Sequence, residues 1–190
     1  MTQPETSQEM SLKDKIWHIG NELSLISTGD LAMLRRGPLR DGEAGAPAFW
    51  KLSVAHDFPA NEQWAAIIEA MSLLTKRKPD GKGHDSPHGK NPFGKALCDG
   101  GDSSWGKGES DPRPALSELR LARLLNSRGK QRREGLLRAV RMIARSGTPV
   151  NCVDIATFIL VAPGDDRPAR AIAKSYYSRL DHASAKTPTK

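Results

Sequence analysis

The chain has 190 residues, of which 37% are hydrophobic and 5% aromatic, and it carries a formal net charge of +7. This length suits one domain or two small ones, and the two cysteines, Cys98 and Cys152, exclude a disulfide framework. No apolar run approaches the roughly 20 residues of a membrane span, and the polar start of the chain is unlike a signal peptide, so we expect a cytoplasmic protein. The strongly positive net charge predicts a polyanionic partner.

The first half of the chain is predicted to form four helices. Apolar residues spaced three or four apart indicate a helix over residues 11–26. Ser27 or Thr28 is a suitable N-cap for the second helix, Pro47 suits the first turn of the third, and Asn61 can cap the fourth. The apolar stripe of the fourth helix comprises Trp64, Ile67, Ile68, Met71 and Leu74.

Residues 75–114 differ in composition from the rest of the chain, because they are rich in Gly, Pro, Ser, Asp and Lys. Only residues 93–97 favour a short helix, and no stretch has the pattern of a strand. The segment is too long for an ordinary loop, so we expect it to be partly mobile and to divide the chain into two helical halves.

The second half is predicted to form four more helices. The first begins near Ala115, and the second covers about residues 130–145. Asn151 can cap the third, and Asp165 or Asp166 can cap the last. The expected inward face of the first of these helices comprises Leu116, Leu119, Ala122 and Leu125.

These elements predict an all-α fold of two small helical bundles joined by a long Gly/Pro/Ser-rich segment. Runs of β-branched and aromatic residues, which are typical of strands, are nearly absent. The expected divisions are a disordered N-terminus (1–10), an N-terminal helical bundle (11–98), a flexible linker (99–114), a C-terminal helical bundle (115–182) and a disordered tail (183–190).

The positive charge is concentrated in one window, residues 113–145. This window holds ten basic and two acidic residues, a net charge of +8, so the rest of the chain sums to −1. Nine of the ten basic residues are arginine, whose planar guanidinium can bind phosphate through two hydrogen bonds. The window therefore predicts a polyanion-binding surface, with an ordinary solvated helix face as the alternative.

Helical spacing places several of these arginines together. Arg138, Arg141 and Arg145 share one side of a helix whose other side is apolar, and Arg120 and Arg123 are one turn apart on the preceding helix. Like charges at this spacing repel each other by a few tenths of a kcal/mol, and a bound anion would relieve that repulsion. Together with Arg128, these are the nucleic-acid-binding candidates that charge and spacing predict.

Two short motifs have the spacing of catalytic or metal sites but not the surroundings. Residues 101–107 have the Gly-x4-Gly-Lys spacing of a phosphate-binding loop, yet Gly108 stands where Ser or Thr would bind magnesium. His84 and His88 are four apart, but neighbouring glycines and a proline exclude the helix that would place them on one face. We expect no catalytic residue, no metal and no cofactor.

The tryptophans are expected to serve mainly in packing. Trp17, Trp50 and Trp64 lie among apolar helix positions, which favours the core over stacking on bases. Trp105 lies in the long polar segment and is a candidate contact residue.

Four blocks of sequence resemble the CasB family, the small subunits of type I-E CRISPR Cascade complexes. Their order and approximate spacing agree over about residues 12–180. The chain departs from the family pattern in its longer segment at residues 76–114. The blocks are residues 29–37 (GDLAMLRRG), 47–52 (PAFWKL), 94–97 (GKAL) and 117–125 (SELRLARLL).

The resemblance implies a non-catalytic subunit made of two helical bundles. Its expected partners are the backbone and large subunits of Cascade, a second copy of itself, crRNA and target DNA. Its expected role is to hold the guide–target hybrid and the displaced DNA strand and so to stabilise the R-loop in antiviral defence. By analogy, the contact candidates are Arg35, Arg36, Lys51, Lys95, Arg120 and Arg123.

Other classes of protein stay open at this point. A helical DNA-binding regulator would use the helix pair at residues 115–145 as a helix-turn-helix, but only Gln131 offers a polar base-reading side chain at the start of its second helix. A nucleotide hydrolase would depend on Lys107. A membrane-surface helix would carry bulky aromatic residues on its apolar face, and residues 130–145 contain none.

Overall fold

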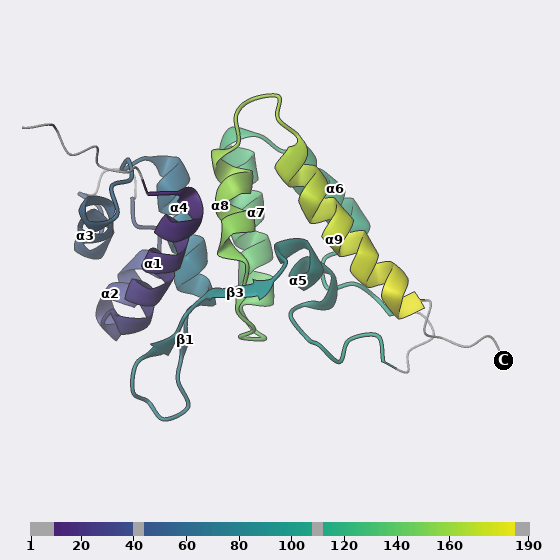
Figure 1. Cartoon of the computed structure of the whole chain (residues 1–190), viewed down its shortest axis with the longest axis horizontal. Coiled ribbons are helices and arrows are strands. Elements are labelled where there is room, and N and C mark those ends of the chain that lie inside the picture. The colour runs from purple at the N-terminus through teal and green to yellow at the C-terminus, as the bar shows by residue number, and fades with distance from the viewer. Residues whose placement is uncertain (1–9, 40–43, 108–111, 185–190) are drawn as a thin grey trace, which may run out of the picture.

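The computed structural model describes residues 10–39, 44–107 and 112–184 (Figure 1). Nine helices and three short strands lie within these residues, which confirms the predicted all-α class. The predicted disordered ends, residues 1–10 and 183–190, fall almost wholly outside the described residues.

The first four helices begin where the capping residues predicted. Helix α1 covers Leu12–Leu25, α2 Thr28–Arg35, α3 Pro47–Ala55 and α4 Glu62–Leu74. The hydroxyl of Ser27 accepts the N–H of Asp30, and the amide oxygen of Asn61 accepts the N–H groups of Gln63 and Trp64. Each cap satisfies N–H groups that have no partner inside the helix, and this is why these helices start there.

The segment between the halves contains more regular secondary structure than predicted. Strands β1 (Lys76–Arg77) and β2 (His84–Asp85) pair antiparallel as a hairpin, and β3 (His88–Asn91) bridges to Val150. The expectation of no strands in this segment was therefore wrong. The predicted short helix is present as α5, Phe93–Asp99.

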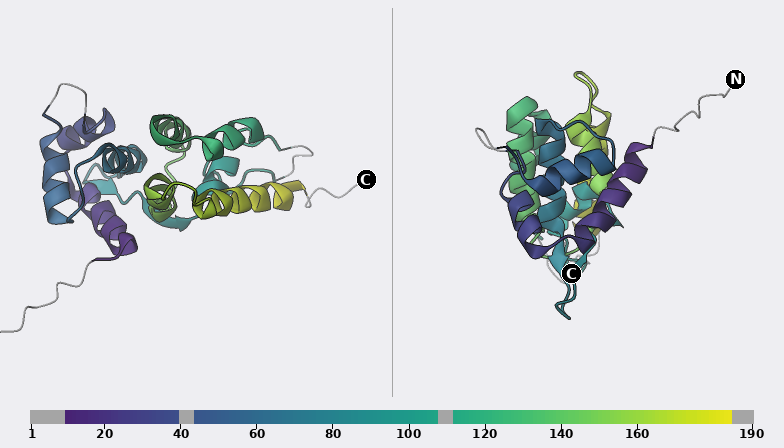
Figure 2. Two further views of the ribbon diagram at one scale, coloured as in Figure 1. Left: turned by 90° about the horizontal axis from the view of Figure 1, so that it is seen from above. Right: turned by 90° about the vertical axis from the view of Figure 1, so that its left-hand side faces the viewer.

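The last four helices also follow the prediction. Helix α6 covers Glu118–Asn126, α7 Gly129–Ile143, α8 Cys152–Leu160 and α9 Arg167–Ser184. The side chain of Asn151 caps α8 by accepting the N–H of Val153. Viewed from above, α6 and α7 lie along one side of this half and α8 and α9 along the other (Figure 2).

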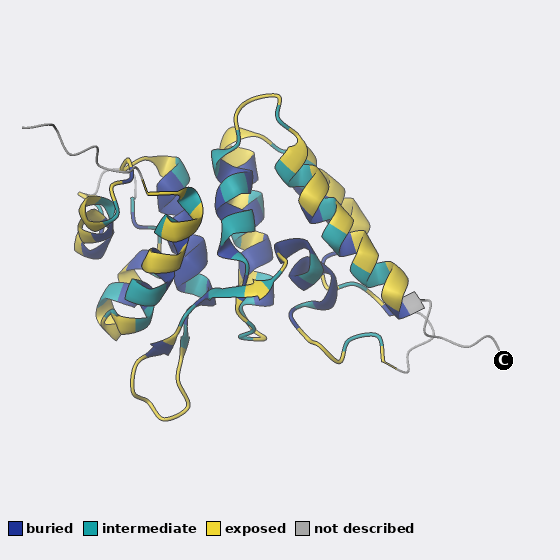
Figure 3. Cartoon of the chain, in the orientation of Figure 1, coloured by how far each residue is buried: buried dark blue, intermediate teal, exposed yellow. Residues whose placement is uncertain are grey.

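One hydrophobic core connects both halves of the chain. Helix α4 is buried along nearly its whole length and packs against α7 and α8, while α1 also contacts α8 (Figure 3). Helix α5 packs mainly against α9, and at Gly94 a Cβ atom would overlap the carbonyl of Ile172. The predicted division assigns α5 to the N-terminal bundle, and this boundary stays a prediction.

Two predictions about packing were wrong. Helix α6 buries Leu121 and Leu124, whereas Leu119, expected to face inward, is 63% exposed. Trp64 is buried as expected, but Trp17 and Trp50 are 52% and 44% exposed. Helices α6, α1 and α3, which contain these exposed residues, carry more apolar residues than one face can bury, and the neighbouring helices decide which of them turn inward.

Candidate nucleic-acid interface

A groove of about 990 Å³ lies between α6 and α7. Buried residues Leu124 and Ala139 and the half-buried Met142 form its apolar part. Gly135 contributes to its form, because a Cβ atom there would come within 3.2 Å of the Leu124 side chain. The absence of a side chain at Gly135 therefore lets the two helices approach closely beneath the groove.

Three arginines surround this groove. Arg120 and Arg123 come from consecutive turns of α6, and Arg138 comes from α7. All three are exposed, and the described lining includes no carboxylate. We call Arg120, Arg123 and Arg138 the groove arginines. Their arrangement gives a concave surface of one charge, with fork-shaped donors suited to phosphate.

Within the described part of the chain, the carboxylate that pairs with one of these arginines interacts only weakly. Glu134 Oε2 lies 4.0 Å from Arg138 Nη1, and the side chains are 51% and 71% exposed. An exposed pair at this separation contributes well under about 1 kcal/mol and is screened by salt. Arg138 can therefore exchange Glu134 for a phosphate at little cost.

Three polar side chains also line the groove, and two of them are already hydrogen-bonded to main-chain carbonyls. Asn126 donates through Nδ2 to the carbonyl of Ala122 at 2.9 Å, and the hydroxyl of Ser127 donates to the carbonyl of Leu124 at 2.6 Å. Gln131 is exposed at the start of α7. The first two side chains thus close the end of α6, whereas Gln131 faces the groove.

Farther along α7, the other predicted contact arginines differ in their surroundings. Arg141 Nη2 lies 2.6 Å from Oε1 of the buried Glu69 on α4, so this guanidinium joins α7 to α4. Arg145 is exposed just after the helix, and its carbonyl accepts a hydrogen bond from Lys76 Nζ at 3.0 Å. Helical spacing predicted one shared side for Arg138, Arg141 and Arg145, but Arg138 lines the groove with α6, Arg141 pairs with Glu69 of α4, and Arg145 lies beyond the end of α7.

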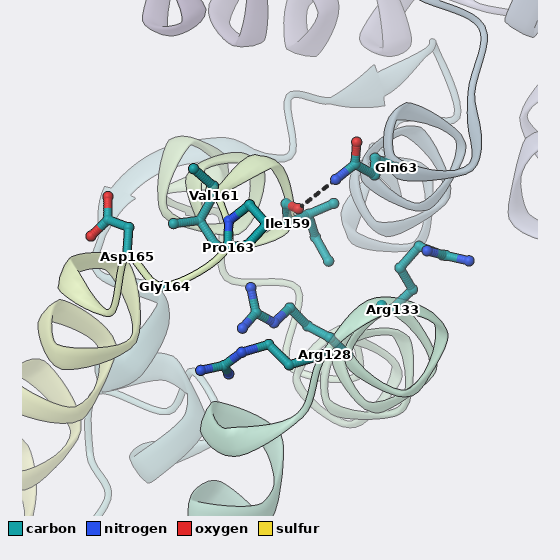
Figure 4. A pocket seen from close by; sticks show the side chains of 11 residues that line it. Gln63, Arg128, Arg133, Ile159, Val161, Pro163, Gly164 and Asp165 are labelled. Atoms are coloured by element: carbon teal, nitrogen blue, oxygen red, sulfur yellow. Dashed lines mark hydrogen bonds between the residues drawn. The ribbon is translucent and has the colours of Figure 1, made fainter.

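A second hollow, of about 450 Å³, lies at the N-terminal end of α7 (Figure 4). It is lined by Arg128, Arg132 and Arg133, opposite the turn that connects α8 to α9. Arg132 is 8% exposed, donates to the carbonyls of Ser127 at 2.9 Å and Phe158 at 3.1 Å, and stacks over the Phe158 ring. Burial lowers the pKa of this guanidinium.

The other two arginines of this hollow are paired. Arg133 forms an ion pair with Glu62 at the start of α4. Arg128 Nη2 lies 3.3 Å from Asp166, and its Nη1 donates to the carbonyls of Leu125 and Ser127. Arg128, a predicted contact residue, therefore helps to join α6, α7 and the start of α9.

The candidates that only the resemblance implied lie away from the groove. Arg35 donates to the carbonyls of Ser72 at 2.9 Å and Thr75, and burial lowers its pKa. Arg36 and Lys51 are exposed, on α2's end and on α3, and Lys95 is half-buried on α5. The structure thus brings together Arg120, Arg123 and Arg138, while the other candidates are spread over several elements.

The catalytic and metal motifs find no supporting geometry. After Lys107 the described chain resumes at Pro112 and forms no helix before α6, whereas a phosphate-binding loop leads into one. His84 is buried, and His88 accepts the N–H of Cys152 at 3.2 Å. Within residues 10–39, 44–107 and 112–184, no group of three or more metal-binding side chains comes together.

Two further expectations concern the long segment and membranes. Trp105 donates its indole N–H to the carbonyl of Arg113 at 3.0 Å and lies under the guanidinium of Arg179, so it packs within the fold. Arg179 also pairs with the buried Asp99 at 2.8 Å.

No helix of the described chain is long and apolar enough to cross a bilayer.

The sequence could not show the roles of arginines whose partners lie far away along the chain. The role of Arg132 depends on the carbonyl of Phe158, and the role of Arg141 depends on Glu69 of α4. The apolar residues between the arginines of α7 correctly indicated a helix. The spacing of residues within α7 could not show which of its arginines would face another helix.

Comparison with known proteins identifies a family that the chain matches. A family model described as CRISPR-associated protein Cse2 matches residues 30–177, which include the groove and all of α7. No curated protein and no solved structure matches the chain.

Proposed function

The chain belongs to the Cse2 family of CRISPR-associated proteins, whose members are subunits of Cascade, and we propose that it holds nucleic-acid backbone in the groove between α6 and α7. The match confirms the resemblance to CasB small subunits. Cse2 proteins are structural subunits and not known enzymes, and we propose that this chain acts without catalysis.

The observation that carries this proposal is the set of groove arginines. Three exposed arginines from two helices line one groove, and Glu134, which pairs with Arg138, is exposed and lies 4.0 Å away. Phosphate satisfies such donors through paired, charge-assisted hydrogen bonds. Contacts of this kind do not read base sequence, so binding is expected to be sequence-blind and to weaken steeply with salt.

In Cascade, these contacts would act on an opened duplex. Base pairing between guide and target reads the sequence, and exchange of a DNA duplex for the guide–target hybrid is close to energetic balance. A few arginine–phosphate contacts can therefore tip that balance. We propose that the groove holds the hybrid or the displaced strand and so stabilises the R-loop, beside the backbone and large subunits and a second copy of this chain.

The test compares two variants with equal loss of charge. One carries Arg120→Gln, Arg123→Gln and Arg138→Gln, and the matched control carries Lys13→Gln, Arg170→Gln and Lys174→Gln at exposed sites outside the groove. Binding to an RNA–DNA hybrid and to single-stranded DNA is measured by fluorescence anisotropy over a range of salt. Circular dichroism confirms that both variants are folded.

The groove variant should bind about tenfold or more weakly and lower the salt slope by about two to three, because each lost phosphate contact removes roughly one. The control should keep most of the affinity. An equal loss in both variants would contradict a site in the groove. Strong preference for one base sequence would instead favour the DNA-binding regulator.

A further inference from the structure

The hairpin of β1 and β2 projects from the body of the molecule, between the N-terminal helices and the loop after α7 (Figures 1 and 2). Lys76 pairs with Asp85 and Arg77 with His84 in its register. The N–H of Lys78 donates to the carbonyl of Gly83 at 3.1 Å, which closes the ladder toward the tip. The hairpin is therefore a defined arm, whereas the sequence suggested an irregular segment.

This arm is basic and exposed. Residues 76–85 contain four basic and two acidic side chains, a net charge of +2. Arg77, Lys78 and Lys82 are all exposed. Of the two acids, Asp80 accepts the N–H of Lys82 at 2.8 Å within the turn, and Asp85 lies opposite Lys76 at the base. The outer part of the hairpin thus presents mainly cations to solvent.

One side of the hairpin base is joined to the end of α7. Lys76 Nζ donates to the carbonyl of Arg145 at 3.0 Å. Gly147 makes this approach possible, because a Cβ atom there would overlap the Lys76 side chain. The exposed Arg145, in the turn after α7, therefore lies at the base of the hairpin.

The other side of the base is joined to the end of α2. The guanidinium of Arg35 binds the carbonyls of Ser72 and Thr75, directly before β1, and Arg36 is exposed at the next position. His84 is buried between these groups, and burial together with the positive charges of Arg35 and Arg77 lowers its pKa. The base of the hairpin thus contacts the end of α2 on one side and the turn after α7 on the other.

We infer that the hairpin is a second backbone contact for the nucleic acid held in the groove, so that the groove arginines, Arg145 and the hairpin form one continuous track. This inference rests on the proposed function of the groove. Helix α7 has 15 residues and so spans about 22 Å, which corresponds to about six or seven phosphates along one strand of a duplex. A short duplex can fill the groove alone, and a longer one can reach the hairpin as well.

The experiment uses duplex length to separate the two contacts. The hairpin variant carries Arg77→Gln, Lys78→Gln and Lys82→Gln, and it is compared with the groove variant and the control triple variant described above. Each is titrated with stem-loop duplexes of about 6 and about 18 base pairs, chosen to be shorter and longer than α7 together with the hairpin. Equal melting temperatures of the hairpin variant and wild type show that the fold is kept.

We expect the hairpin variant to bind the long duplex about fivefold to tenfold more weakly and to lower its salt slope by about two to three, with little effect on the short duplex. The groove variant should weaken binding to both duplexes. If the hairpin variant matches the control on the long duplex, the second contact is wrong while the groove stands. If the groove variant also matches the control, the proposed function itself fails.

A third result would show that the hairpin contacts a protein and not the nucleic acid. If the hairpin variant binds both duplexes like wild type but no longer co-purifies with the other Cascade subunits, the arm contacts a subunit, and the nucleic-acid inference is overturned. An equal loss of affinity on the short and long duplexes would contradict the track, because the short duplex in the groove should not reach the hairpin.

Discussion

The two hollows beside α7 contain three arginines each but use them differently. At the N-terminal end, Arg132 is buried against carbonyl oxygens and Arg133 is paired with Glu62. In the groove with α6, Arg120 and Arg123 are exposed, and Glu134, the carboxylate that pairs with Arg138, is exposed and 4.0 Å away. The difference lies in what faces each guanidinium. Carbonyls and carboxylates of the chain itself take up the first set, while the second set faces solvent.

This difference separates stability from binding among residues that look alike in the sequence. A guanidinium that satisfies buried carbonyls is needed for the fold, and its removal leaves those carbonyls without a donor. An exposed guanidinium contributes little to the fold and can be offered to a ligand. The net charge of a window counts both kinds equally, so it marks the region of a site but overstates the number of residues in it.

The sharpest test of the comparison is Arg132→Ala. This change removes the donor to the carbonyls of Ser127 and Phe158 and the stacking on the Phe158 ring. We expect the free energy of unfolding to fall by about 3 kcal/mol, measured by urea denaturation. The exposed neighbour Lys130→Ala should change it by less than about 0.5 kcal/mol. Equal effects would remove the distinction between the two hollows.

The adjacent pair Arg35 and Arg36 repeats the comparison within two residues. Arg35→Ala removes donors to the carbonyls of Ser72 and Thr75, so we expect a loss of about 2 kcal/mol in stability. Arg36→Ala should leave stability nearly unchanged and weaken binding to a long duplex. Thermal melting and anisotropy on the same two samples check both effects. A stable Arg35→Ala protein with weakened binding would mean that Arg35 serves the ligand.

Arg138→Gln and Arg141→Gln contrast two arginines one turn apart. Arg138→Gln should weaken binding about fivefold, or by about 1 kcal/mol, without loss of stability. Arg141→Gln removes one partner of the buried Glu69, so its main effect should be a stability loss of similar size. Reversed effects, with Arg141 decisive for affinity, would move the binding surface from the groove toward α4.

Acidification should destabilise the hairpin more than the groove. Of the predicted effects, we expect this change in stability to be the smallest. Because the pKa of His84 is lowered, the unfolded chain takes up a proton near pH 6.5 while the folded chain does so only at lower pH. The stability contributed by neutral His84 is therefore complete above about pH 6.5 and is lost as the pH falls through that value. Arginines stay charged throughout this range.

Hydrogen exchange of the Lys78 amide, which is bonded to Gly83, reports the state of the hairpin. Its exchange, corrected for the intrinsic effect of pH, should become faster between pH 7.5 and 5.5 in wild type. In His84→Gln the corrected rate should be independent of pH. The same pH dependence in both proteins would show that His84 is not its source.

The helices could be predicted because their signals are local. Ser27 and Asn61 lie within three residues of the N–H groups that they cap, so the sequence itself contains both partners. The hairpin was missed because its strands have two residues each and lack alternating apolar residues. Its position depends instead on Lys76 reaching the carbonyl of Arg145, a contact between distant parts of the chain.

The sequence indicated which two helices form the candidate site but not which of their residues face the groove. Charge and helical spacing pointed to α6 and α7, where the groove lies. The inward face of α6 was misplaced because Leu119, Leu121 and Leu124 offer two alternative apolar stripes. Which stripe is buried depends on α7 and α9, and so does the outward direction of Arg120 and Arg123.

The close approach of α5 to α9 at Gly94 has a consequence for recognising relatives of this chain. Residues 94–97 formed one of the blocks that carried the family resemblance, and at its first position a methyl group would collide with the Ile172 carbonyl. In a saturation library, we expect only glycine to be tolerated at residue 94, while the half-buried Lys95 should accept many replacements. Glycine at residue 94 is therefore a steric requirement of the contact between α5 and α9, and it does not depend on what the groove binds.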